Sequence, residues 1–295
     1  MSTAQRRDVV ILGNTGFIGR ALEAHFAAQG IGVRGFSSAS LDLRQRDNLA
    51  ALDGCVTTGT SLVVTSATAS GSAMTPTALA ENVAMIANLA AYLGSHPAGL
   101  CVYLSSDALY PMQEEAVRED TPTDASSFYP LSKYAAERVL DYGARRSSTP
   151  LLVVRPTAVY GPGDTHNAYG PNRFARSLAR ERVVQLFGEG EETRDHIYID
   201  DLVQAIAGLS LRGEGGLVNV ATGTSVSFRA VAEALRRLAD DDCQIVTTPR
   251  RNAVTHRRFD VSRLRAILPE WRPTPLEAGL EATLADARRT STTDG

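Results

Sequence analysis

Short apolar runs alternate with longer stretches of helical periodicity through the first half of the chain. The apolar runs predict β-strands at residues 8–13, 31–36, 61–67, 99–106 and 151–156. Between two of these runs, apolar residues recur at helical spacing from Leu79 to Leu93, which predicts an amphipathic helix. Such alternation is typical of a parallel sheet covered by helices on both faces. The pattern therefore predicts an α/β fold with a doubly wound parallel sheet.

The second half of the chain loses this regular alternation after "VYGPGDTHNAYGPN", residues 159–172. Shorter strands are predicted at 196–199 and 217–221, followed by helices that begin near Phe228 and Leu276. We expect a first domain in residues 1–160, to whose sheet residues 195–224 return. Residues 161–295 then form mainly a smaller α+β lobe.

The stretch "ILGNTGFIGRAL" places Gly13, Gly16 and Gly19 between the first predicted strand and a helix. A sharp strand-to-helix turn needs one residue without Cβ, another where a pyrophosphate approaches the backbone, and a third where helix and strand pack closely. The helix N-terminus then offers free N–H groups to phosphates. A glycine triplet can also be a plain structural turn, but its place between strand and helix favours a dinucleotide site.

A second pattern lies in "SSFYPLSKYAAERVL", where Tyr129 and Lys133 are four residues apart. A helix puts both side chains on one face. A nearby ammonium favours the phenolate, so we expect Lys133 to lower the pKa of Tyr129 toward working pH. Tyr129 would then be a usable acid–base group, whereas the alternative is a solvated helix face.

Several further stretches follow in order: "LDLRQ", "ENVAMIANLAAYL", "YLSSDALYP", "VVRPTAVYGPGD" and "RDHIYIDDLVQAI". Together with the glycine turn and the "YPLSK" stretch, they resemble the extended short-chain dehydrogenase/reductase family over nearly the whole chain. The resemblance is to its NAD(P)-dependent nucleotide-sugar epimerases, dehydratases and 4-ketoreductases. It implies a Rossmann-type first domain, with the α+β lobe binding substrate.

The resemblance also implies roles for individual residues. Tyr129 would be the catalytic acid–base group, Lys133 its partner, and Ser106 the hydroxyl that hydrogen-bonds the reacting oxygen. The cofactor would be NAD or NADP, with Asp42 at the adenine. The residues implied in cofactor binding are Gly13, Asn14, Thr15, Gly16, Phe17, Ile18, Gly19, Ser37, Ser38, Asp42, Leu43, Ser66, Ala67, Asn82, Tyr129, Lys133 and Pro156.

A nucleotide-sugar substrate is implied as well, with Arg194 pairing with its diphosphate through a planar guanidinium fork. The implied substrate contacts are Asp107, His166, Asn172, Arg173 and Arg194. For Arg194 the alternative is a surface ion pair with Asp195. His256 and Arg257 are weighed evenly between substrate contact and a plain polar segment.

Departures from the family pattern narrow the reaction. Where an acidic residue would bond the ribose of NAD, the chain reads "GFSSAS"; Ser37 and Ser38 leave room for a 2′-phosphate, with Arg34 nearby. Ala108 stands where dehydratases carry a glutamate, which disfavours elimination of water. The resemblance then implies hydride transfer at C4 of the sugar. The enzyme would be a 4-epimerase or, alternatively, an NADPH-dependent 4-ketoreductase. A non-catalytic dinucleotide-binding sensor or scaffold is a third hypothesis.

Composition limits the partners. A formal net charge of -3 offers no basic surface for nucleic acid, and no apolar run approaches the length of a membrane span. The spacing of the histidines, cysteines and carboxylates indicates no metal site. Three cysteines without metal or CxxC spacing, and an N-terminal apolar run too short for a signal peptide, favour the cytoplasm. We expect a cytoplasmic homodimer.

Overall fold

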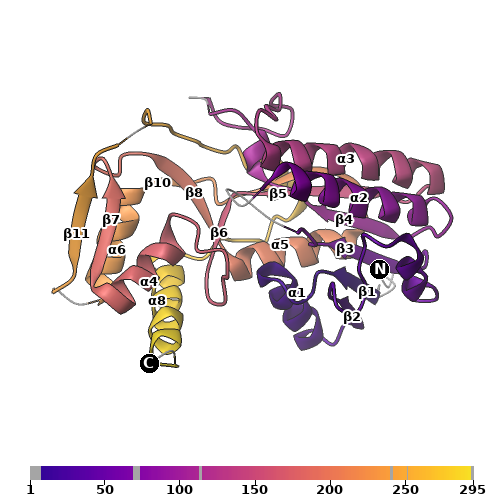
Figure 1. Ribbon diagram of the computed structural model, residues 1–295, viewed down its shortest axis with the longest axis horizontal. Coiled ribbons are helices and arrows are strands. Elements are labelled where there is room, and N and C mark those ends of the chain that lie inside the picture. The colour runs from indigo at the N-terminus through magenta and orange to yellow at the C-terminus, as the bar shows by residue number, and fades with distance from the viewer. Residues whose placement is uncertain (1–7, 69–73, 113–114, 240–241, 251, 294–295) are drawn as a thin grey trace.

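The computed structural model describes residues 8–68, 74–112, 115–239, 242–250 and 252–293 (Figure 1). A six-stranded parallel sheet forms the centre of the larger domain. Its spatial order is β2 (Val33–Phe36), β1 (Asp8–Leu12), β3 (Thr60–Val64), β4 (Leu100–Leu104), β5 (Leu151–Pro156) and β9 (Gly216–Val220). The predicted doubly wound α/β fold is therefore confirmed.

Helices cover both faces of this sheet (Figure 1). They are α1 (Phe17–Ala28) and α5 (Ile199–Arg212) on one face, and α2 (Pro76–Leu93) and α3 (Phe128–Ser147) on the other. Because side chains alternate along a strand, Val9 and Ile11 pack under α1 and α5, whereas Val10 and Leu12 face the α2 side. Strands covered on both faces must be apolar throughout, which explains their unbroken apolar sequences.

The second lobe holds two small sheets and three helices in the described part of the chain. One sheet has the order β10 (Ser225–Ser227), β8 (Thr193–Tyr198), β6 (Ala158–Tyr160), and the other pairs β11 (Gln244–Thr248) with β7 (Val183–Phe187). The helices are α4 (Pro171–Glu181), α6 (Phe228–Ala239) and α8 (Leu276–Thr293), whereas α7 (Ser262–Ile267) packs against β9 of the larger domain. Apolar residues of α4, α6, α8 and β7 form a separate core.

The chain passes between domain and lobe more than once. Of residues 195–224, α5 and β9 belong to the larger domain, whereas β8 pairs with β6 and β10 in the lobe. Short helical turns η1 (Arg46–Leu52) and η3 (Asp107–Leu109) follow the second strand and β4. Among the described residues, no helix is both long enough and apolar enough to cross a membrane.

His196 of β8 lies inside the lobe core. It is 4% exposed, and its ring centroid lies 6.4 Å from that of Tyr160 and 5.7 Å from that of Phe228. Within the described residues neither ring nitrogen has a hydrogen-bond partner. Burial lowers the pKa of His196 to about 4, so the imidazole is neutral in the folded protein at neutral pH.

We expect His196 to make the stability of the protein depend on pH in acid. The unfolded chain takes up the proton first as the pH falls below 6.5, so stability is lost between that value and about 4. The loss is about 3 kcal/mol of unfolding free energy. His196→Phe should remove this dependence in urea unfolding series at several pH values. Parallel pH curves for the two proteins would contradict the assignment.

Candidate active site

The glycine turn occupies the carboxyl end of β1. Gly13 has φ +95°, and a Cβ there would lie 2.8 Å from Thr65 Oγ1 and 2.9 Å from the Ser66 nitrogen. A Cβ on Gly19 would collide with the carbonyl oxygen of Gly13. Close packing therefore requires glycine at both position 13 and position 19.

The N-terminus of α1 is open to a ligand. Gly16 caps the helix without a side-chain hydrogen bond, and among the described residues beyond its chain neighbours and its own helix backbone, a Cβ there would meet within 4 Å only the Gly13 oxygen, at 3.4 Å. The first N–H groups of a helix have no intrahelical acceptor and attract phosphate. The turn therefore fits the diphosphate of a dinucleotide.

The end of β2 lies against this turn. The Gly13 nitrogen donates to the Phe36 oxygen at 2.7 Å, which places Ser37 and Ser38 beside the glycines. The Ser40 hydroxyl closes the following turn, accepting from the Ser37 nitrogen at 2.9 Å. Residues 37 and 38 are serines rather than acidic residues, so this edge offers hydroxyl groups to a ribose.

Two charged residues near this edge have partners within the chain. Arg34 donates to Cys55 Sγ at 2.9 Å and lies over the Phe36 ring, 5.2 Å from its centroid. Asp42 accepts from Arg44 Nη2 at 2.9 Å. Their predicted contacts with phosphate and adenine stay predictions, since both side chains would exchange these partners for a ligand.

Asn82 supports the segment that follows β3. Its side-chain oxygen accepts from the Thr68 nitrogen at 2.8 Å and from the Thr68 hydroxyl at 3.1 Å. Asn82 is buried, so these bonds fix the segment that contains Ser66 and Ala67. In this structure Asn82 acts on the cofactor side of the sheet by holding a loop.

The predicted catalytic residues converge at the carboxyl end of β4. Ser106 caps η3, its hydroxyl accepting from the Ala108 nitrogen at 3.1 Å. Tyr129 lies in the first turn of α3, where an interaction with Ser106 acts to lower its pKa. Lys133 is 9% exposed and donates from Nζ to the Leu104 oxygen at 2.8 Å. The structure thus brings Ser106, Tyr129 and Lys133 together.

The charge relation between Tyr129 and Lys133 differs from the prediction. Burial raises the pKa of Tyr129 and Asp107 raises it further, while the hydrogen bond with Ser106 opposes them. The expectation that Lys133 lowers this pKa is therefore wrong, because the lysine is itself buried and directed at a backbone carbonyl. Burial lowers the pKa of Lys133 to about 8, against the attraction of Glu137.

Lys133 is the only lysine among the 30 Lys and Arg residues of the chain. An arginine stays protonated at any working pH, whereas a buried lysine readily titrates near neutrality. A chain that uses arginine everywhere else keeps an amine at this position. The presence of a single lysine supports a chemical role for Lys133. This signal can be found from the sequence alone.

Asp107 is held from the second lobe. Arg257 donates from Nη1 to Asp107 Oδ2 and to the Asp107 oxygen, both at 3.0 Å, and from Nη2 to the Tyr110 oxygen at 2.7 Å. Arg257 is buried, and the Asp107 side chain is 18% exposed. Burial raises the pKa of Asp107 while Arg257 lowers it. Arg257 thus has a structural partner in Asp107, which the sequence spacing does not reveal.

Arg194 lies near the same carboxylate. It donates to the Thr255 oxygen and to Thr255 Oγ1, each at 2.8 Å, and its charge acts on Asp107. Asp195 is buried instead among Thr157, Thr222 and Gly223, so the alternative of an Arg194–Asp195 surface pair is wrong. Arg194 remains available to a diphosphate if it exchanges Thr255 for phosphate oxygens.

The remaining predicted substrate contacts organise the loop after β6. Asn172 is 6% exposed and bonds both the nitrogen and the oxygen of Gly161, at 2.9 and 3.1 Å. His166 bonds Asp164 at 3.2 Å, and this hydrogen bond raises the pKa of His166. Arg173 lines a groove of about 560 Å³ between α4 and β7. Substrate contact by these residues stays a prediction.

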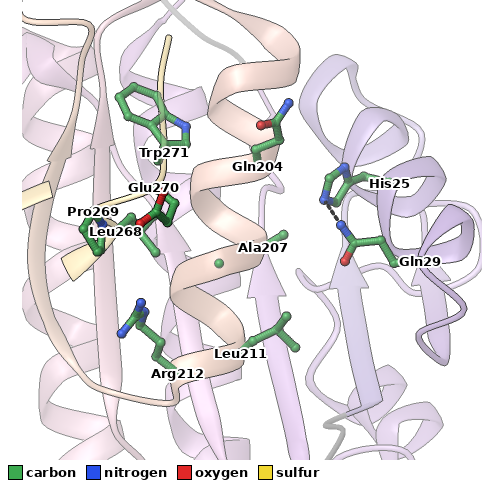
Figure 2. A pocket seen from close by; sticks show the side chains of 11 residues that line it. His25, Gln29, Gln204, Ala207, Leu211, Arg212, Leu268, Pro269, Glu270 and Trp271 are labelled. Atoms are coloured by element: carbon green, nitrogen blue, oxygen red, sulfur yellow. Dashed lines mark hydrogen bonds between the residues drawn. The ribbon is translucent and has the colours of Figure 1, made fainter. Parts of the chain in front are cut away.

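A second groove, of about 430 Å³, lies between α1, α5 and residues 268–271 (Figure 2). Figure 2 shows His25 and Gln29 on one side of α5 and Trp271 on the other. None of the predicted catalytic, cofactor or substrate residues lines this groove. Within the described residues, no group of three or more His, Cys, Asp or Glu side chains is placed to hold a metal ion.

Comparison with known proteins agrees with this geometry. A family model described as "NAD dependent epimerase/dehydratase family" matches residues 9–221. The chain belongs to this family. The matched residues contain the glycine turn, helix α3 with Tyr129 and Lys133, and the edge of the sheet between them.

Curated relatives include epimerases and reductases. A dTDP-4-dehydro-6-deoxy-D-allose reductase of a Streptomyces species is 30% identical over 216 residues, which are 70% of this chain and 66% of that protein. A UDP-glucose 4-epimerase of Mycolicibacterium smegmatis is 31% identical over 179 residues, 59% of this chain and 56% of that protein. The chain thus spans less than two thirds of the length of these relatives.

Solved structures show the same fold. A Thermus thermophilus UDP-glucose 4-epimerase in complex with NAD has a TM-score of 0.84 and 23% identity, covering 95% of this chain and 99% of that one. RMD from Pseudomonas aeruginosa, in complex with NADPH, has a TM-score of 0.83 and 23% identity, with 96% and 99% covered. At this identity the likeness concerns the fold.

We expect Gly13→Ala to destabilise the protein more than Gly54→Ala does. Gly54 has φ +74°, and apart from its chain neighbours no heavy atom of the described residues lies within 4 Å of a Cβ there, so its variant reports the backbone cost alone, about 1 kcal/mol. Gly13→Ala adds the clash with Thr65 and Ser66 and should cost at least about 1 kcal/mol more. Urea unfolding measures both. Equal losses would show that the packing of the turn against β3 is not tight.

Proposed function

We propose that the chain is an NAD(P)-dependent enzyme acting at C4 of a nucleotide-activated sugar, a nucleotide-sugar 4-epimerase. The observation that carries this is the convergence of Ser106, Tyr129 and Lys133 at the sheet edge that also holds the glycine turn. Family membership and relatives named as UDP-glucose 4-epimerase and dTDP-L-rhamnose 4-epimerase support it.

Each residue has a chemical task in this proposal. Tyr129 takes the proton of the C4 hydroxyl and later returns it, while Ser106 hydrogen-bonds the reacting oxygen. The nicotinamide, when bound, accepts and gives back the hydride. Lys133 supplies a donor for a ribose hydroxyl. Epimerisation results when the 4-keto sugar turns over before it is reduced on its other face.

The second candidate is an NADPH-dependent reductase of 4-keto nucleotide sugars. Two observations favour it: the raised pKa of Tyr129, and Ser37 in place of an acid beside the glycine turn. A protonated phenol is the form that donates to a carbonyl oxygen. An uncharged position beside the ribose accepts a 2′-phosphate, which an acid would repel.

Arg194 is the proposed handle for the diphosphate of the sugar nucleotide. Its charge acts on Asp107 beside Ser106, and this nearness to the proposed catalytic residues supports the role. A guanidinium fork forms charge-assisted bonds with phosphate oxygens. Asp107 and the loop residues His166, Asn172 and Arg173 then border the sugar.

One assay separates the two candidates. The purified protein is incubated with a panel of UDP-, GDP- and dTDP-hexoses plus NAD, and in parallel with their 4-keto derivatives plus NADPH. An epimerase interconverts the hexoses without net use of cofactor, whereas a reductase consumes NADPH stoichiometrically. Dinucleotide binding without turnover of any member would favour the sensor or scaffold hypothesis.

We expect Tyr129→Phe to lose a factor of about 10² to 10⁴ in turnover, the usual range for a lost acid–base group. Dinucleotide affinity should stay nearly unchanged, since the glycine turn is intact. Calorimetry and steady-state kinetics measure the two effects separately. Tyr142→Phe, on the exposed face of the same helix, is the matched control. Near-normal turnover of Tyr129→Phe would refute the assignment.

A homodimer through α3 is also proposed. Phe128, Leu131, Tyr134 and Tyr142 are 39 to 67% exposed and fall within about one third of the helix circumference. Large aromatic and aliphatic side chains on one helix face suit a symmetric contact with a second copy. Three free cysteines, Cys55, Cys101 and Cys243, support a reducing compartment, for which the cytoplasm is proposed.

We expect the protein to sediment at twice its chain mass of 31.5 kDa, and Tyr142→Glu to sediment as a monomer. The variant buries a charge at the proposed contact and lies more than two turns from Lys133, so the site should be unaffected. Sedimentation equilibrium at micromolar concentration is the measurement. A monomeric wild type, or a dimeric variant, would rule out this face.

A further inference from the structure

A buried ionic network lies directly under the catalytic residues. Glu137 Oε1 accepts from the Ser105 hydroxyl at 2.5 Å and from Arg155 Nε at 2.9 Å. Glu137 Oε2 accepts from Arg155 Nη2 at 2.6 Å. Glu137 is 7% exposed and Arg155 is 4% exposed. One carboxylate therefore joins α3, the end of β4 and β5.

Each member of this network adjoins a predicted site residue. Ser105 precedes Ser106, and Glu137 follows Lys133 by one helical turn on the same face of α3. Arg155 spreads its guanidinium over the Tyr110 ring, 4.8 Å from the centroid, in the segment that follows η3. Sliding α3 along β4 would break charged hydrogen bonds away from water, which is costly.

The stability of a buried ion pair does not by itself account for this arrangement. Apolar residues of similar volume often replace such a pair at no cost, or with a gain in stability. Buried charges do impose a definite geometry and a definite field on their neighbours. The neighbours here are Lys133 and Ser106.

Charged and aromatic side chains from several elements surround Lys133. Its Nζ donates to Leu104 and lies 5.3 Å from the centroid of the Tyr103 ring, while Tyr129 and Glu137 share its helix face. Arg155 binds Glu137 from β5, and Asp107 acts on Tyr129 from η3. Glu137 attracts the ammonium of Lys133, and Arg155 partly cancels that attraction.

We propose that Glu137 and Arg155 are positioning residues for the acid–base pair. The Glu137 carboxylate holds Lys133 and Ser106 in register, and Arg155 limits how much of its negative charge acts on the lysine. The part played in catalysis rests on the proposed function. The placement and the charge of Lys133 are properties of the folded chain alone.

The single lysine makes a direct test feasible. Full-length protein labelled with ¹³C-lysine gives one set of side-chain resonances, and their titration by NMR reports Lys133 alone. Glu137→Gln removes the attracting charge and should move the titration down, whereas Arg155→Met should move it up. Each shift should be about 1 pH unit or more. A purely structural role would not produce shifts of opposite sign.

Asp141→Asn is the matched control. Asp141 lies on the same helix and bonds Arg145 Nε at 3.0 Å near solvent. It lies two turns from Lys133, so its loss should leave the lysine titration in place. Circular dichroism and thermal unfolding establish that each variant is folded.

The double variant Glu137→Gln with Arg155→Met covers the case in which a single variant does not fold, because it removes both charges. Its Lys133 titration should fall between those of wild type and Glu137→Gln. Unmoved titrations, or shifts in the same direction for both single variants, would overturn the proposal.

The experiment needs neither substrate nor cofactor, so it separates this inference from the proposed function. Shifted titrations without turnover of any nucleotide sugar would refute only the function. Normal turnover with unmoved titrations would refute only the positioning role. In an active enzyme, the pH dependence of kcat should move with the NMR titration of each variant while KM stays constant.

Discussion

The ion pair between Glu137 and Arg155 is the interaction on which the site depends. It stands where α3, β4 and β5 meet, and both of its side chains are buried. Because an unpaired charge there would be costly, the three elements must meet in one register. That register brings the start of α3 to the end of β4, and with it Tyr129 to Ser106.

The second constraint is the return of the chain to the larger domain. β9 completes the sheet beside β5, and the 252–260 segment crosses back so that Arg257 reaches Asp107. The second lobe and the carboxyl edge of the sheet are thereby joined by a partly buried ion pair rather than by a flexible linker alone. A nucleotide sugar held by the lobe would be presented to a fixed edge, which is how positioning contributes to catalysis.

The hydrophobic pattern and the glycine spacing were sufficient to predict the sheet, the turn and the helix face of Tyr129 and Lys133. These features depend on residues close together in the sequence, or on the rule that parallel strands share their carboxyl edge. The partners of Arg194 and Arg257 could not be predicted, because Arg257 and Asp107 are 150 residues apart. The burial of His196 could not be predicted either, because in the sequence it is an ordinary strand residue and only the packing of the lobe buries it.

The sequence by itself determined which groups are present: three glycines at a strand-to-helix turn, a tyrosine and the only lysine on one helix face, and a serine at a strand end. Only the tertiary structure decided their charge. Burial raises the pKa of Tyr129 and lowers that of Lys133, opposite to a simple pairing of the two. The physical reason is that desolvation and the field of Asp107 come from contacts between distant elements, and local spacing carries no information on them.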